Sequence, residues 1–215
     1  MHAVVVAGGE LPGAGADAVT RLIDQADVVI AADSGFDHCR TLGRWPTMLV
    51  GDLDSISADG VTDAEAHDVQ IKRFPADKDA TDLALAFEEA IDRGASAITV
   101  VGAFGGRLDH ELATIGMLTT IGWAGIAISA DDGCRRLWVV HSTIELAQPI
   151  GSTLSIVPWG NQSSAVTTSG LQWPLHNDTL AAGSTRGVSN ICVAPTQSIT
   201  ADNGVVLVIA VSEQR

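Results

Sequence analysis

The sequence predicts an α/β protein with a doubly wound, mostly parallel sheet, followed by a smaller antiparallel β-sandwich. Two observations favour this fold class. Up to about residue 135, short apolar runs alternate with helical patterns, which is typical of parallel βαβ units. Beyond that point helical periodicity disappears, and β-rich runs follow one another between Gly, Pro, Asn and Ser. We therefore expect two domains, residues 1–135 and 136–215.

The first half contains alternating candidate strands and helices. Its strands are mostly continuous apolar runs, which indicate burial on both faces, and each is closed by turn residues such as Gly8-Gly9 or Asp33-Ser34-Gly35. Its helices show apolar residues at helical spacing. The expected strands are residues 3–7, 28–32, 48–50, 69–74, 97–101 and 125–130, and the expected helices are residues 14–25, 36–42, 81–93 and 108–121.

The second half contains only short β-rich runs. They are separated by turn residues, with neither an internal repeat nor a flexible linker between the halves. The expected strands are residues 137–140, 143–146, 153–157, 164–168, 191–194 and 205–211.

Composition and charge narrow the class of protein. The chain has 215 residues, of which 46% are hydrophobic, enough for a sizeable core. Its net charge of -14 argues against nucleic-acid or anionic-membrane binding, which needs a cationic face. The three cysteines lie far apart without metal-binding spacing, and neither a basic leader nor a bilayer-length apolar run occurs. We expect a soluble cytoplasmic protein.

Gly51-Asp52-Leu53-Asp54-Ser55 carries the most distinctive chemistry. It follows an apolar run that indicates a buried strand. Two carboxylates two residues apart in an extended segment point the same way, and their repulsion favours a cation between them. A hard ion such as Mg²⁺, which often accompanies nucleotide phosphates, is the simplest candidate. Gly, Asp and Ser are also ordinary turn residues, so this stretch alone leaves a surface turn open.

Two more polar clusters open predicted helices. Asp77-Lys78-Asp79-Ala80-Thr81-Asp82 precedes an amphipathic pattern, where Asp79 as a helix cap is the structural alternative to a metal or phosphate role. In residues 102–110, glycines allow close backbone approach to an anion, and Arg107 can clamp a phosphate. Because strand ends of a parallel sheet meet at one edge, these clusters should converge with Asp33-Ser34 and Asp52/Asp54.

The second half offers one candidate aromatic contact, Trp173, in the stretch Gly170-Leu171-Gln172-Trp173-Pro174-Leu175. A Trp beside a Pro in a small β domain is more often a packing residue. An exposed indole can instead stack on a flat cationic heterocycle.

Together the motifs resemble the thiamine pyrophosphokinase (thiamine diphosphokinase) family. The matching stretches run in the family's order over nearly the whole chain. They are Ala32-Asp33-Ser34-Gly35, residues 51–56, Asp79-Ala80-Thr81-Asp82, residues 105–110, residues 170–175, Asn177-Asp178, Leu180, Gly183 and Ser189-Asn190. Ser34 stands where members more often have Gly, and Thr114 lies near a position where bacterial members often have Asn.

The resemblance implies diphosphate transfer from ATP to the hydroxyethyl oxygen of thiamine, with release of AMP, by a Mg²⁺-dependent homodimer that binds thiamine near its subunit interface. It implies catalytic roles for Asp52, Asp54, Asp79, Arg107 and Asp109, and Mg²⁺ ligation by Asp52, Asp54, Asp79 and Asp82. It assigns ATP and its phosphates to Asp33, Ser34, Asp52, Ser55, Lys78, Asp79, Thr81, Asp82, Gly105, Gly106 and Arg107. It assigns thiamine to Asp109, Trp173, Ser189 and Asn190.

Two other functions remain as alternatives. A phosphatase with an Asp-x-Asp nucleophile motif would need no ATP, but that motif usually follows the first strand, whereas Asp52 and Asp54 follow the third. A non-catalytic nucleotide or thiamine sensor on the same fold would not require so many acids around phosphate.

Overall fold

The computed structural model describes residues 1–121, 125–160 and 164–211. The chain divides into two compact units, one formed by residues 1–118 and 125–133 and the other mainly by the chain from Cys134 onward. The domain bounds expected from the sequence, 1–135 and 136–215, remain a prediction.

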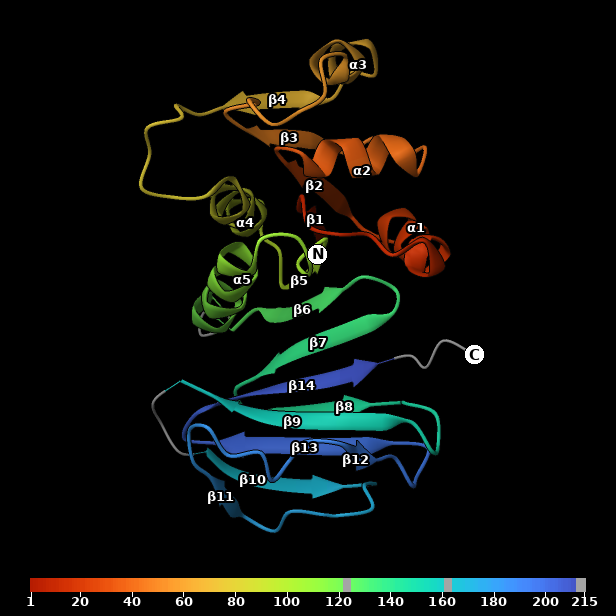
Figure 1. Ribbon diagram of the computed structural model, residues 1–215, viewed down its shortest axis with the longest axis vertical. Helices are drawn as coiled ribbons and strands as arrows, with labels where there is room; N and C mark the ends of the chain where they lie inside the picture. The colour runs from red at the N-terminus through yellow and green to blue at the C-terminus, as the bar shows by residue number, and fades with distance from the viewer. Residues whose placement is uncertain (122–124, 161–163, 212–215) are drawn as a thin grey trace. The chain divides into compact units, whose positions relative to one another are not determined.

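The first unit is built on six parallel strands (Figure 1). Their order is β4-β3-β2-β1-β5-β6, and every neighbouring pair is parallel. The chain thus runs outward from β1 in one direction and then returns to build the other side, so ligands are expected at the carboxyl ends near β1. The strands are β1 (His2–Val6), β2 (Val28–Ala32), β3 (Met48–Gly51), β4 (Gln70–Arg73), β5 (Ala97–Val101) and β6 (Ala127–Asp131).

Helices lie on both faces of this sheet (Figure 1). Apolar side chains from the first three helices share one core cluster with β1, β2 and β3, and α4 buries Ala86, Phe87 and Ala90 on the other face. The helices are α1 (Ala16–Asp24), preceded by the 3₁₀ turn η1 (Gly13–Gly15), α2 (Gly35–Thr41), α3 (Gly60–Ala66), α4 (Asp82–Asp92) and α5 (Leu108–Ile121).

The expected strands and helices of this half are all present, with two corrections. Helix α3 was not predicted. It has seven residues, of which only Gly60 and Ala64 are buried, so its sequence shows no clear helical periodicity of apolar residues. The cap of α4 is Thr81, whose hydroxyl accepts a hydrogen bond from the amide of Ala84 at 3.2 Å. Asp79 is therefore not the cap, and its carboxylate remains available for another role.

The second unit is a sandwich of antiparallel strands, as predicted. One sheet has the order β12-β9-β14-β7 and the other β11-β10-β13-β8. Residues of β9 alternate between buried and partly exposed, so one face of this strand packs into a shared apolar core. The strands are β7 (Arg135–Val140), β8 (Thr143–Leu146), β9 (Thr153–Trp159), β10 (Ser164–Ser169), β11 (Asp178–Leu180), β12 (Asn190–Ile191), β13 (Gln197–Asp202) and β14 (Val205–Val211).

The strand predictions of this unit need three corrections. The strand expected at residues 191–194 is β12, which is shorter and lies one residue earlier. Strands β11 and β13 were not predicted, β11 because it has only three residues. In β13 the core-facing series begins with a polar residue, Gln197, which hides the alternation. Its buried carboxamide is satisfied by the main chain of Gln148 and the carbonyl of Ala194.

None of the helices in the described part of the chain combines the length and the apolar character that a membrane span requires.

Candidate active site

Three aspartates gather beyond the carboxyl ends of β2 and β3. Asp33 follows β2 with a left-handed backbone (φ 47°), Asp52 follows β3, and Asp82 begins α4. One carboxylate oxygen from each lies within 4.8 Å of the others. The parallel topology therefore brings together acids that are up to 49 positions apart in sequence. We call Asp33, Asp52 and Asp82 the acidic triad.

Two oxygens of the acidic triad are buried without a hydrogen bond. Within the described part of the chain, no donor is aligned on Oδ1 of Asp33 or Oδ1 of Asp82. Burial raises the pKa of Asp33, and the charges of Asp82 and Asp52 raise it further against the opposing hydrogen bond from Ser55. Buried carboxylate oxygens without an aligned donor are costly unless cations share them, so this donor set fits a hard ion such as Mg²⁺.

Lys78 supplies a positive charge at the same place. Its Nζ lies 3.2 Å from Oδ2 of Asp52 and 3.1 Å from Oδ1 of Asp82, and its side chain is only 14% exposed. The contact with Asp82 is an ion pair that is not aligned as a hydrogen bond, since Oδ1 has no aligned donor. Both carboxylates raise the pKa of Lys78 although burial opposes them, so the ammonium stays charged at neutral pH.

The Asp52–Asp54 segment differs from the expectation of an extended pair. Leu53 between the two acids has a left-handed backbone (φ 69°), because the chain turns here and the amide of Asp54 donates to Oδ1 of Asp52 at 3.2 Å. That hydrogen bond, followed by the one from Lys78, lowers the pKa of Asp52. The charge of Asp52 in turn raises the pKa of the exposed Asp54. The two carboxylates are electrostatically linked, but they are not equivalent.

Gly51 leaves room for Asp33 and Asp82 to approach each other. A Cβ on Gly51 would lie 3.1 Å from Cβ of Asp33 and 3.2 Å from Oδ1 of Asp82. A side chain at this position would therefore push against both acids, and the backbone of Gly51 (φ 155°) is one that other residues rarely adopt.

The expected metal set is brought together only in part. Asp52 and Asp82 belong to the acidic triad, as expected, and Asp33, expected at the phosphates, completes it. Asp54 and Asp79 are exposed and lie outside this group of described residues. Their metal roles remain predictions, as does the phosphate role of Thr81, whose hydroxyl caps α4.

Two serines expected at the phosphates flank Asp33. The hydroxyl of Ser55 donates to Oδ2 of Asp33. Oγ of Ser34 lies 2.0 Å from the place where a Cβ on Gly8 would stand, so it reaches the backbone just beyond β1. The residue that departs from the family pattern, Ser34, thus lies at the central strand of the sheet.

Residues of the Gly-rich loop after β5 bind two carboxylates from the first turn of α5, those of Asp109 and Glu111. Arg107 makes a two-point ion pair with Asp109, with Nε 3.2 Å from Oδ1 and a terminal nitrogen 2.6 Å from Oδ2. Both side chains are exposed, at 72% and 65%. The amide of Gly105 donates to Oε2 of Glu111 at 2.9 Å. Glu111 was not predicted from the sequence, and its place in the first turn of α5 was the signal that could have indicated it.

The loop that carries Trp173 is fixed by Asn190. The indole of Trp173 is 57% exposed, so it is not a core residue, and the packing alternative is excluded. Asn190 is buried, and its carboxamide binds both the amide and the carbonyl of Trp173. Ser189 is exposed with a left-handed backbone (φ 61°), and its amide donates to the hydroxyl of Ser155. Contact of any of these residues with thiamine remains a prediction.

Comparison with known proteins decides the family. Residues 19–129 match the family model "Thiamin pyrophosphokinase, catalytic domain". Residues 141–206 match "Thiamin pyrophosphokinase, vitamin B1 binding domain". The chain belongs to the thiamine pyrophosphokinase family. The family and the enzyme class expected from the sequence, a thiamine diphosphokinase, are thereby confirmed.

Individual relatives agree with the thiamine pyrophosphokinase assignment. "Thiamine pyrophosphokinase 1" of rice (Oryza sativa subsp. japonica) is 31% identical over 174 residues, 77% of this chain, which spans 66% of that relative's length. "Thiamine pyrophosphokinase 3" of rice is also 31% identical, over 88% of this chain and 81% of the relative. The crystal structure of thiamine pyrophosphokinase from Bacillus subtilis has a TM-score of 0.87 at 24% identity, covering both chains completely, and supports the fold.

Proposed function

We propose that this chain transfers the β,γ-diphosphate of ATP to the hydroxyethyl oxygen of thiamine, giving thiamine diphosphate and AMP. A bond forms between the thiamine oxygen and the β-phosphorus, and the bond from that phosphorus to the α,β-bridging oxygen breaks. The hydroxyl proton is released. The observation that carries the proposal is the acidic triad with Lys78, because phosphoryl transfer depends chiefly on positioning and charge neutralisation.

Asp33, Asp52 and Asp82 are the residues that would hold Mg²⁺. Their two buried oxygens without aligned donors support this assignment, since oxygen ligands suit a hard cation. When bound, Mg²⁺ would neutralise charge on the polyphosphate. Asp54 and Asp79 are proposed as further acids of the same region, which act on the ion or on the bound phosphates.

The other polar residues of the first unit are proposed to hold the phosphates. Lys78 and Arg107 supply positive charge, and Ser34, Ser55 and Thr81 supply hydroxyls near the ends of the strands and the start of α4. The guanidinium of Arg107 is paired with Asp109, so it must leave this ion pair or bind both groups at once in order to bind a phosphate. Asp109 is then free to orient the thiamine hydroxyl.

The second unit is proposed to bind thiamine through Trp173 and Ser189, with Asn190 as a further residue of the same site. An exposed indole suits a flat heterocycle beside a cationic thiazolium ring. We also propose a homodimer, on the family resemblance alone, and sedimentation at working concentration tests it. We also propose a cytoplasmic location, a reducing compartment that suits the buried thiols of Cys39 and Cys192.

Incubation with thiamine, ATP and Mg²⁺, with separation of the products, tests the reaction. Equal amounts of AMP and thiamine diphosphate are expected. ADP with thiamine monophosphate would contradict diphosphate transfer and indicate an ordinary kinase. Phosphate release without thiamine would favour the Asp-x-Asp phosphatase, and binding without turnover would favour the sensor.

A further inference from the structure

The loop that carries Asp52 and Asp54 is hydrogen-bonded at two points to the segment around the start of α2. We call residues 52–59, between β3 and α3, the acidic loop. Ser55 donates to Asp33, just before α2. Ser57 donates to Asp37, one helical turn further on, from its amide at 3.0 Å and from its hydroxyl at 2.7 Å. The first tie ends on a member of the acidic triad, and the second ends on a residue without an assigned role.

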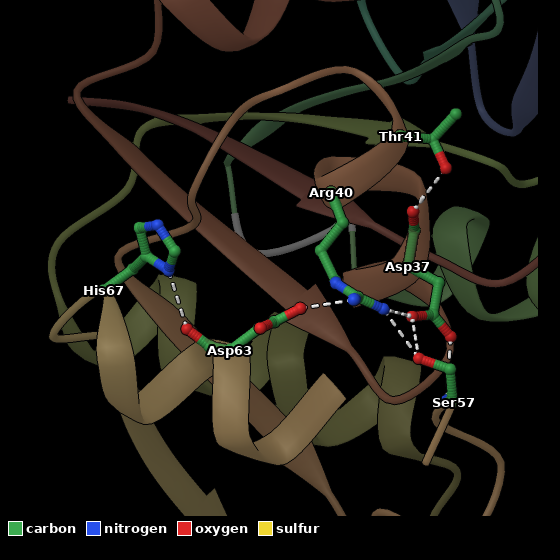
Figure 2. A network of polar contacts seen from close by, with 6 residues as sticks. All are labelled: Asp37, Arg40, Thr41, Ser57, Asp63 and His67. Carbon is green, nitrogen blue, oxygen red and sulfur yellow. Dashed lines mark hydrogen bonds and ion pairs between the residues drawn. The ribbon is translucent and has the colours of Figure 1, made fainter. Parts of the chain in front are cut away.

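Arg40 completes the second tie. Its guanidinium donates to Oδ1 of Asp37 at 3.0 Å and to the hydroxyl of Ser57 at 2.7 Å, and its other terminal nitrogen pairs with Asp63 of α3 (Figure 2). One side chain therefore joins α2, the acidic loop and α3. We call Asp37, Arg40, Ser57 and Asp63 the loop clamp.

The loop clamp differs from an ordinary surface ion pair. Isolated exposed pairs contribute little, because two flexible side chains must be ordered for one screened contact. Here the Arg40 side chain is 26% exposed, and its rigid fork meets three partners at once. Asp37 also receives a main-chain amide of the acidic loop, so the clamp holds loop backbone rather than side chains alone.

We propose that Arg40 is a positioning residue that, through Asp37 and Ser57, holds the acidic loop in the conformation that binds Mg²⁺. The inference rests on the proposed metal role of the acidic triad. Without the clamp, the acidic loop samples other conformations, and the apparent affinity for the ion falls by the fraction of time spent in the competent one. Groups that orient metal ligands typically change metal affinity 10- to 100-fold, so about a tenfold loss is expected.

The test compares Arg40→Met with Arg44→Met. The first keeps the aliphatic stem and removes the fork. Arg44 is a matched control, because it makes a similar two-point ion pair with Asp24 at 2.5 and 2.9 Å and donates to the carbonyl of Gly43, both outside the acidic loop. Mg²⁺ is titrated into each protein without ATP while the melting temperature is followed, and product formation is measured over the same Mg²⁺ range.

Arg40→Met is expected to raise the half-maximal Mg²⁺ concentration about tenfold in both measurements, with turnover at saturating Mg²⁺ largely retained. Arg44→Met is expected to leave this midpoint unchanged. A wild-type midpoint in Arg40→Met, or an equal increase in Arg44→Met, would overturn the positioning role. If the wild type shows no response to Mg²⁺, the metal site itself fails and the clamp with it.

A second variant keeps the proposal testable if Arg40→Met does not fold. Ser57→Ala removes the loop hydroxyl but leaves the ion pairs of Arg40 with Asp37 and Asp63 in place. It is expected to raise the Mg²⁺ midpoint by roughly threefold, less than Arg40→Met does, because the hydroxyl loses its hydrogen bonds with Asp37 and Arg40 while the amide of Ser57 still donates to Asp37. An unchanged midpoint in Ser57→Ala would also overturn the proposal.

Discussion

Asn190 binds the main chain of Trp173 on both sides of the residue. Oδ1 of Asn190 accepts from the amide of Trp173 at 3.1 Å, and Nδ2 donates to its carbonyl at 2.7 Å. Oδ1 also accepts from the amide of Ile191 at 2.9 Å. A buried carboxamide used in this way orients the exposed indole, and we infer that Asn190 serves thiamine binding through Trp173.

A double-mutant cycle tests that inference. Trp173→Ala is expected to weaken thiamine use about tenfold to thirtyfold, as for the loss of roughly 1.4–2 kcal/mol of stacking, with little change in ATP use. Asn190→Ala is expected to weaken thiamine use as well, because the loop carrying Trp173 loses its anchor. In the Trp173→Ala background, Asn190→Ala is expected to add almost nothing.

The control for this cycle is thermal unfolding of each variant. Trp173→Ala is expected to keep nearly the wild-type melting temperature, since the indole is 57% exposed. Asn190→Ala removes the hydrogen bonds of three main-chain groups, the amide and carbonyl of Trp173 and the amide of Ile191, and is expected to cost about 1–3 kcal/mol of stability. If Asn190→Ala retains its full effect on thiamine in the Trp173→Ala background, Asn190 contacts thiamine directly.

Asp82→Asn tests the acidic triad, with Asp92→Asn as its matched control. Asp82 begins α4 and Asp92 ends it, so the same change is made at opposite ends of one helix. Asp82→Asn removes a charge from the proposed Mg²⁺ site and is expected to lower turnover at least a hundredfold and Mg²⁺ affinity at least tenfold. Asp92→Asn is expected to change neither. Equal Mg²⁺ titrations for the two variants would contradict the assignment.

Stability in acid tests the hydrogen bonds of Asp37. Burial opposes ionisation, but hydrogen bonds from Ser57 and Arg40 outweigh it, so the pKa of Asp37 is lowered. A lowered folded pKa gives stability that is present above the ordinary aspartate value of about 4 and is lost as pH falls through the folded pKa. The stability difference between wild type and Asp37→Asn is therefore expected to be constant above about pH 5 and to shrink below pH 4.

Urea unfolding of the two proteins at a series of pH values measures this difference. Other aspartates with lowered pKa titrate in both proteins and cancel in the comparison. A difference that stays constant down to pH 3 would show that the hydrogen bonds do not favour the ionised form of Asp37.

The parallel sheet was predictable from sequence, because strands buried on both faces are continuous apolar runs, as in β2. The convergence of Asp33, Asp52 and Asp82 followed from the rule that parallel strands end at one edge. Within the site, the relative orientation of the side chains depends on local backbone conformation, which the pattern of apolar and polar residues does not reveal. Leu53 adopts a left-handed backbone that no apolar period indicates, so the relation of Asp52 to Asp54 was mistaken.

Residues that act through other residues left little signal in the sequence. Arg40 and Asp37 lie on a short helix and resemble any solvent-facing pair until the acidic loop is folded against them. Gln197 is a polar residue at a core-facing position, so the alternation of β13 was not recognised. Its carboxamide can be buried there because it binds the main chain of Gln148, 49 residues away, and the carbonyl of Ala194. Such long-range satisfaction of polar groups is visible only in three dimensions.

Lys78→Met tests whether the ammonium and a divalent cation compete for the same oxygens. Nζ of Lys78 lies within 3.2 Å of both Asp52 and Asp82. Without it, mutual repulsion of the carboxylates rises, and the metal-free protein is expected to melt at a lower temperature. Mg²⁺ then meets less competition, so its half-maximal concentration in a thermal titration without ATP is expected to fall several-fold. Turnover is expected to fall, because Lys78 also serves the phosphates.

Lys72→Met is the matched control for this change. Lys72 pairs with Glu89 at 2.6 Å, outside the acidic triad, so its loss removes the same charge and a comparable ion pair. It is expected to leave the Mg²⁺ midpoint where it is in the wild type, which separates local competition from the general effect of a more negative protein. If Lys78→Met binds Mg²⁺ more weakly than Lys72→Met, the ammonium supports the ion rather than competing with it, and Lys78 must then act by holding Asp52 and Asp82 in place.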